Sequence, residues 1–171
     1  MTGEPQRSKT VRRLVLGERL GGFIYGTIVA LSVVVAGGRA YPDDAGHIAA
    51  LVGVTSLVFW LAHVYANGLT YSVGHDEHLS FGRLGRIARH EAAILEAALP
   101  PLAALLLGAA GLISTEASVW AALGVGLAVL VLQGVFFARA ERLGWIGTVT
   151  VVGVNLALGL AIVGLKLLLT H

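Results

Sequence analysis

The sequence predicts an all-α integral membrane protein that crosses the bilayer five times. In composition, 56% of the 171 residues are hydrophobic and only 13% are charged, whereas a soluble domain is charged at about 25% of its positions. The apolar residues also form long runs, each near the roughly 20 residues that a membrane-spanning helix needs. No period-two alternation typical of barrel strands accompanies them, so we expect helices. The runs are 20–37, 48–69, 91–113, 117–138 and 145–169.

The segments around the first two runs predict a tail and a turn. Residues 1–17 read as a basic tail whose last part is amphipathic enough to lie in the membrane interface, ahead of a single transmembrane domain over 18–171. Pro42 and the paired acids beside it favour a turn between the first and second runs.

The longest and most polar connection is the segment 70–90. Ser80 is a candidate N-cap for a surface helix that carries Arg83, Arg86 and Arg89 on successive turns and leads into the third run. Pro100 and Pro101 lie inside that run, where we expect them to kink it. Short turns at 114–116 and 139–144 then separate the last three runs.

Positive charge alternates between the connections, and this alternation predicts orientation. Of the twelve Lys and Arg residues, all but Arg39 and Lys166 lie before the first run or in the second and fourth connections. The excess of Lys and Arg on cytoplasmic loops then places the N-terminus inside and the C-terminus outside. We expect a multi-pass protein of a bacterial inner membrane, without a cleaved signal peptide.

Several functional classes are disfavoured. The chain has no cysteine, which excludes disulfides and thiolate chemistry, and it contains no phosphate-binding loop, dinucleotide fingerprint or nucleophile elbow. We therefore expect neither an enzyme nor a bound cofactor. The basic balance, a net charge of +2, reads as membrane anchoring rather than as nucleic-acid binding.

A polar stripe in the second run is the most specific candidate site. Ser56, Trp60, His63 and Asn67 recur at helical spacing and therefore share one face. At the same depth, the other runs contribute Tyr25, Glu96, Gln133 and Thr150. Ionisable groups inside spans are candidates for ion or proton passage, with His63 and Tyr25 as the expected partners of Glu96. The alternative is that these groups only hold the helices together.

Two further patterns each allow two interpretations. Gly22, Gly26 and Ala30 form a small-residue face, suited either to packing within the chain or to meeting other copies around an axis. The loop sequence His75, Asp76, Glu77 and His78 holds side chains that ligate zinc, iron or manganese. Four adjacent loop residues rarely reach one ion, so a solvated polar loop is the favoured interpretation.

Two short motifs resemble the potassium-channel family of transmembrane protein 175 and its bacterial relatives. The text from Arg19 to Gly26 is similar to the Arg-Leu-x-x-Phe-Ser-Asp-Gly start of the family's pore-lining helix, although Ile24 and Tyr25 replace its Ser-Asp pair. Trp60 and His63 match its Trp-x-x-His motif. The family has six helices per unit, against the five predicted here.

The resemblance implies an oligomeric cation pathway lined by the first helix and braced by Trp60 and His63. Its apolar constriction would fall on Val29 and Ala30, which are smaller than the family's isoleucine.

The functional hypothesis is a small homo-oligomeric channel for monovalent cations such as potassium, or for protons. One alternative is a divalent-metal transporter of the vacuolar iron transporter type, which shares the five-span topology. Another is a non-catalytic subunit of a larger membrane complex.

Overall fold

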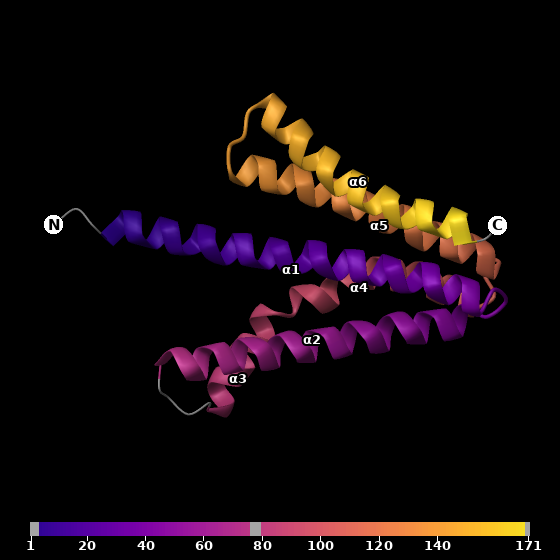
Figure 1. Cartoon of the computed structure of the whole chain (residues 1–171), viewed down its shortest axis with the longest axis horizontal. Coiled ribbons are helices and arrows are strands. Elements are labelled where there is room, and N and C mark those ends of the chain that lie inside the picture. The colour runs from indigo at the N-terminus through magenta and orange to yellow at the C-terminus, as the bar shows by residue number, and fades with distance from the viewer. Residues whose placement is uncertain (1–3, 76–79, 170–171) are drawn as a thin grey trace.

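The computed structural model describes residues 4–75 and 80–169, and within them the chain forms only helices and turns. The predicted all-α fold of a polytopic membrane protein is thereby confirmed. The helices are α1 (Glu4–Ala40), α2 (Ala45–His75), α3 (Phe81–His90), α4 (Ala93–Ala109), α5 (Thr115–Ala140) and α6 (Trp145–Leu169), shown in Figure 1.

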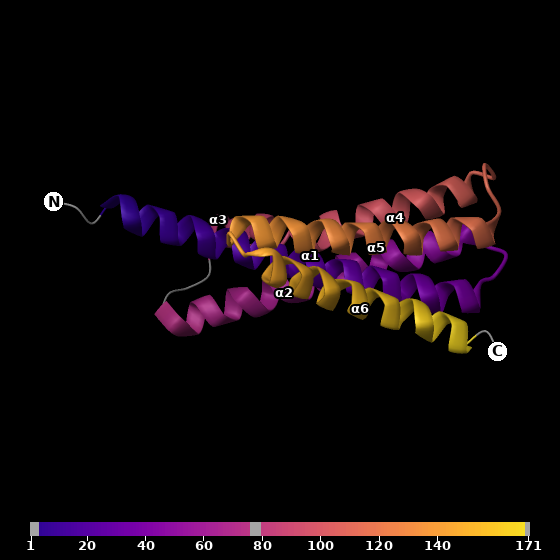
Figure 2. The same cartoon turned by 90° about the horizontal axis from the view of Figure 1, so that it is seen from above.

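Helix α1 is the centre of the bundle. Helices α2, α4, α5 and α6 pack one beside the next in that order, and α1 contacts all four of them. Figure 1 shows α1 running lengthwise through the molecule, with α2 on one side and the α5–α6 pair on the other, and Figure 2 shows α4 and α6 on opposite sides of α1. Residues on α1 can therefore meet partners from almost every other helix.

Four helical segments are long and apolar enough to cross a membrane. They are Arg19–Ala40, Ala45–Ser72, Thr115–Ala140 and Trp145–Gly164, and the number rises to five if α3 and α4 together form one bent span. These two helices meet at an angle of 46° across Glu91 and Ala92.

The predicted third run, 91–113, is shorter as a helix than the sequence suggests. Helix α4 has 17 residues, or about 25 Å at 1.5 Å per residue, and it continues through Pro100 and Pro101. It ends where Gly111 adopts a positive φ of 74° and the backbone N–H of Leu112 donates to the carbonyl of Leu107. This is the glycine-dependent helix stop that the sequence GAAGL favours.

Polar residues at the turns fix the other helix ends. Asp44 begins α2, because its carboxylate accepts a hydrogen bond from the backbone N–H of His47 at 2.9 Å, and this bond lowers the pKa of the Asp44 carboxyl. Ser114 caps α5 by accepting from the N–H of Ala117. Ser80 occupies the N-cap position of α3, as predicted, but its side chain makes no capping bond.

The basic connections gather at one end of the bundle. Figure 1 shows the N-terminal part of α1, the C-terminal end of α2, helix α3 and the α5–α6 turn at the same end. We call this the basic end, because Arg19, the arginines of α3, Arg139 and Arg142 belong to these segments. Basic connections that alternate with less basic ones along the sequence are therefore gathered at one end of the folded bundle.

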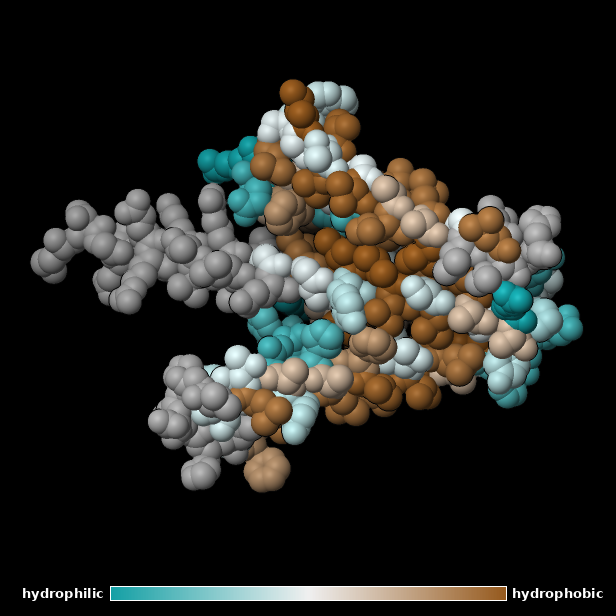
Figure 3. Space-filling view, viewed as in Figure 1, coloured by the Kyte–Doolittle hydropathy of each residue, from teal (hydrophilic) through white to brown (hydrophobic). Residues whose placement is uncertain are grey.

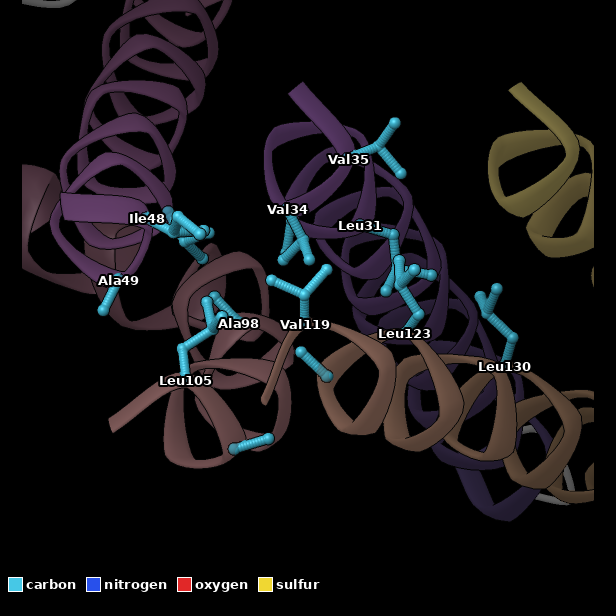
Figure 4. Close-up of a cluster of buried hydrophobic side chains, with 14 residues drawn as sticks. Leu31, Val34, Val35, Ile48, Ala49, Ala98, Leu105, Val119, Leu123 and Leu130 are labelled. Atoms are coloured by element: carbon cyan, nitrogen blue, oxygen red, sulfur yellow. The ribbon is translucent and has the colours of Figure 1, made fainter. Parts of the chain in front are cut away.

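The opposite half of the bundle is a packed apolar core. Leu31, Val34, Ile48, Leu105 and Leu123 are fully or almost fully buried there. Figure 4 shows these side chains meeting between α1, α2, α4 and α5. The polar groups that could carry a function lie toward the basic end, beyond this core.

Candidate functional site

An ion pair joins α1 to the beginning of α4. One guanidinium nitrogen of Arg19 donates to both carboxylate oxygens of Glu96, at 3.1 and 3.2 Å. Both side chains are about half exposed, at 51% and 45%, so the attraction is screened where water reaches it. The expected partners of Glu96, His63 and Tyr25, make other contacts.

Tyr25 and His63 instead meet each other across α1 and α2. Their ring centroids are 5.3 Å apart, and the ring of Phe59, one turn earlier on α2, lies 5.9 Å from the Tyr25 ring. The Nδ1 of His63 lies 3.0 Å from the carbonyl oxygen of Phe59. Because a carbonyl only accepts, Nδ1 carries the proton, which leaves Nε2 as the atom that can take up another.

Two hydrogen bonds attach α2 to the α3–α4 corner. The indole nitrogen of Trp60 donates to the backbone carbonyl of Ala88 at 3.0 Å. About two turns further along α2, the amide nitrogen of Asn67 donates to a carboxylate oxygen of Glu91 at 2.8 Å. The same oxygen of Glu91 lies 3.6 Å from Nδ1 of His90. In the predicted α2 stripe, Ser56 is buried and Trp60 and His63 are half-buried. Asn67, at the end of the stripe, is exposed but bonds to Glu91.

Two adjoining pockets open beside this corner. Asn67, Ile87, His90 and Glu91 line a pocket of about 280 Å³, which we call the Glu91 pocket. A second pocket of about 340 Å³ shares Ile87 and His90 with it. Figure 3 shows hydrophilic surface in the recess between α1 and α2, and hydrophobic surface over most of the remaining visible bundle.

We call the set of side chains that bridge α1, α2 and the α3–α4 corner the polar cluster. Apart from the contact between the neighbours His90 and Glu91, each bridge joins residues from different helices, so the cluster exists only when these helices are packed together. Its members are Arg19, Tyr25, Trp60, His63, Asn67, His90, Glu91 and Glu96.

The small-residue face of α1 packs against α4 of the same chain. Gly26 is buried, and a methyl group at its Cα would lie 2.7 Å from the carbonyl oxygen of Ile94. At Gly22 the nearest atoms would be at ordinary contact distances, from 3.8 Å. Ala30 is fully buried in the core and Val29 is partly buried. In this conformation that face is closed to a second copy of the chain.

Gln133 is separate from the polar cluster. Its side chain is buried in α5, and neither Nε2 nor Oε1 has a hydrogen-bond partner. Its neighbour Gly134 approaches α6 at Val152 and Asn155. Thr150 is exposed and bonds to the carbonyl of Ile146 in its own helix. The expected polar layer across five spans is thus concentrated on α1, α2 and the α3–α4 corner.

The metal hypothesis concerns residues that the structure leaves undescribed. Asp76, Glu77 and His78 lie outside the described residues, and His75 is the last residue of α2. Within the described part of the chain, no three His, Cys, Asp or Glu side chains come close enough to hold a metal ion.

Sequence reasoning missed the roles of Arg19, His90 and Glu91. Arg19 was counted only among the basic residues that predict orientation, and Glu91 was not named as a site residue, although only 15% of its side chain is exposed. The position of Asn67, at the end of its stripe nearest the basic end, was the signal that a polar partner lay opposite.

The polar cluster combines two carboxylates with one arginine and two imidazoles. Comparison of the chain with protein-family models, with curated proteins and with solved structures finds no match.

Proposed function

We propose that this protein moves protons or monovalent cations such as potassium across its membrane, using the polar cluster as the binding site on the cytoplasmic side. The observation that supports this most directly is the environment of Glu91. Its carboxylate is mostly buried and is contacted by the amide of Asn67 and the imidazole of His90. Neither group carries a fixed positive charge, whereas the other carboxylate, Glu96, is paired with Arg19.

The end of α3 adds to this negative charge. Glu91 is the C-cap of that helix, where the last backbone carbonyls present the negative end of the helix dipole. A carboxylate at that place favours a bound proton or cation. Broken helices whose carbonyl ends face an ion site are a recurring device in membrane transport proteins.

His63 provides a second group for proton transfer. It is half-buried, it contacts Tyr25 of α1, and its Nε2 is the atom available to accept a proton. A proton that arrives at the basic end could be held at His63 or at the Glu91 pocket, both of which lie on the α2 side of the recess.

The packed core closes the other half of the bundle. Ala30, Leu31 and Leu105 are fully buried, so a bound ion reaches the far side only if the helices separate or if a second copy completes a path. This favours a protein that opens to one side at a time, or a homo-oligomer whose path runs between subunits, over a permanently open pore within one chain.

Flux measurements on proteoliposomes test the proposal. Purified protein is reconstituted, and proton and potassium fluxes are recorded with pH-sensitive and potassium-sensitive dyes. Glu91→Gln should lower the flux by roughly tenfold, the loss that corresponds to about 1.4 kcal/mol of ion-binding free energy. Glu116→Gln is the matched control, because Glu116 is exposed in the first turn of α5 at the opposite end.

The result that overturns the proposal is wild-type flux no greater than that of empty vesicles. Equal losses of flux in Glu91→Gln and Glu116→Gln would show that the flux does not depend on the polar cluster. Uptake of manganese or iron without potassium or proton flux would favour the divalent-metal alternative. A copurifying partner together with absent flux would favour the role of an accessory subunit.

A further inference from the structure

Three buried polar side chains lie at one level of the bundle, where α5 packs against α1 and α6. Thr27 of α1 is fully buried, and Gln133 of α5 and Asn155 of α6 are 8% and 6% exposed. The amide nitrogen of Asn155 donates to the backbone carbonyl of Leu130 at 3.2 Å, so α6 reaches the turn of α5 that precedes Gln133. We call Thr27, Gln133 and Asn155 the Gln133 seam.

A contact between α1 and α5 gives the level of Thr27. Leu31 of α1 lies against Gly126 of α5, and the two helices run in opposite directions (Figure 1). One turn from this contact toward the basic end are therefore Thr27 on α1 and Leu130 on α5. Gln133 follows within a turn of Leu130, on the same face of α5 as Gly126.

Helix α6 is closely attached to the same part of α5. A Cβ at Gly134 would lie 3.1 Å from the Cα of Val152 and 3.2 Å from the amide nitrogen of Asn155. A Cβ at Gly159 would overlap the side chain of Leu127. Small residues that bring two membrane helices this close stabilise the pair, so we expect α5 and α6 to move as one unit.

The amide of Gln133 is the one group of the seam without a bond. Neither its Nε2 nor its Oε1 has a hydrogen-bond partner among the described residues, whereas the hydroxyl of Thr27 donates to the carbonyl of Phe23 at 2.9 Å. An amide both donates and accepts, and leaving it unbonded inside a packed bundle is unfavourable. Polar groups within membrane spans are satisfied by protein or by a water-filled cavity. Water at the seam would therefore stabilise Gln133.

We propose that the bundle opens at the Gln133 seam, where the α5–α6 pair moves away from α1 and water reaches the Gln133 amide. The packed arrangement described above is the closed state. Tyr25 of the polar cluster and Thr27 are two residues apart and point from nearly opposite sides of α1, so both polar regions flank the same part of this helix. Use of the seam as the route for ions rests on the proposed function, whereas its opening does not.

Thiol labelling measures the opening, because the chain has no cysteine of its own. Thr27→Cys and Ala138→Cys are placed separately in lipid nanodiscs and treated with a charged methanethiosulfonate reagent, and modification is followed by mass spectrometry. Ala138 is the matched control, since it is 1% exposed and lies nearer the basic end than the seam. Buried thiols are inert, so Thr27→Cys should be modified about tenfold faster than Ala138→Cys.

Removal of the amide tests the part that Gln133 plays. Gln133→Met is apolar and favours the closed state, so in the Thr27→Cys background it should slow labelling by about fivefold, which corresponds to about 1 kcal/mol. In proteoliposomes Gln133→Met should lower the flux by a similar factor while raising the melting temperature. A damaged protein loses both flux and stability, so this opposite change identifies the amide as a group that favours opening. Gln133→Asn keeps the amide and should retain most of the flux.

The outcomes separate this inference from the proposed function. Labelling of Thr27→Cys no faster than that of Ala138→Cys would overturn the opening at the seam. Unchanged labelling after Gln133→Met, or a lowered melting temperature, would overturn the role of the amide. Wild-type flux that Gln133→Met leaves unchanged would show that ions take another route. Fast labelling of Thr27→Cys in a protein without flux would refute transport and support the opening.

Discussion

Gly26 is the position where α1 and α4 come closest, and its replacement by alanine gives a sharp test of the bundle. The added Cβ would lie 2.7 Å from the carbonyl oxygen of Ile94 and 2.9 Å from the Cα of Ile94. Both are backbone atoms, so no side-chain rotation can relieve the overlap. Carbon atoms pack best at about 3.5–4.0 Å, which means that the two helices must separate by roughly 0.6 Å or more.

The cost of this separation follows from known overpacking effects. Forcing a methyl group into a close-packed contact costs about 1–3 kcal/mol, while alanine in place of glycine gains about 1 kcal/mol of helix propensity. We therefore expect Gly26→Ala to lower the free energy of unfolding by up to about 2 kcal/mol after both effects are combined, and to be about 1–3 kcal/mol less stable than an alanine that gains the propensity without the overlap. Because small residues let membrane helices approach closely, the loss should appear inside the membrane as well as in detergent.

Unfolding by sodium dodecyl sulfate, followed by circular dichroism in mixed micelles, measures this difference. Gly21→Ala is the matched control on the same helix, since nothing lies within 4 Å of a Cβ at Gly21. It should be at least as stable as the wild type. If Gly26→Ala were as stable as Gly21→Ala, the close α1–α4 contact, and with it the placement of Arg19 beside Glu96, would be refuted.

Three other substitutions test separate parts of the structure by the same unfolding measurement. Asp44→Ala should melt below the wild type and Asp44→Asn should not, because asparagine also caps helices. Part of the stabilisation that Asp44 gives relative to Asp44→Ala depends on its charge. This part is present above the usual carboxyl pKa of 3.8 and should disappear as the pH falls through the lowered pKa of Asp44. Trp60→Phe should cost about 1 kcal/mol and speed hydrogen exchange over Phe81–His90, whereas Trp145→Phe should change neither, since Trp145 is largely exposed. Gln133→Met should stabilise the protein by about 1–3 kcal/mol, and a loss instead would show that the buried amide has a partner in the membrane.

The helical architecture was predictable because it follows from one-dimensional patterns. Apolar runs of membrane length predicted long helices, and the run 145–169 coincides with helix α6. Ser80 and the three spaced arginines predicted α3 as a separate helix. The positive φ of Gly111 explains why α4 ends before the apolar run does.

The candidate site was harder to predict because it depends on which helices touch. The stripe of Trp60, His63 and Asn67 was recognised from spacing alone, but spacing does not say what lies opposite. The choice of Arg19 as the partner of Glu96 depends on the closeness of α1 to α4 at Gly26, which is a three-dimensional fact. Depth along a span was therefore a poorer guide to partners than the pattern of small residues.

Helix α1 is one unbroken rod of 37 residues, about 56 Å long, although only Arg19–Ala40 is suited to the hydrocarbon. No hinge separates the leading turns from the buried part. A movement of Glu4–Gly17 at the membrane surface would therefore be transmitted along the helix to Tyr25 and would alter the contact between its ring and His63. Two glycines inserted after Gly17 would make the helix flexible at that point and would uncouple Glu4–Gly17 from Tyr25.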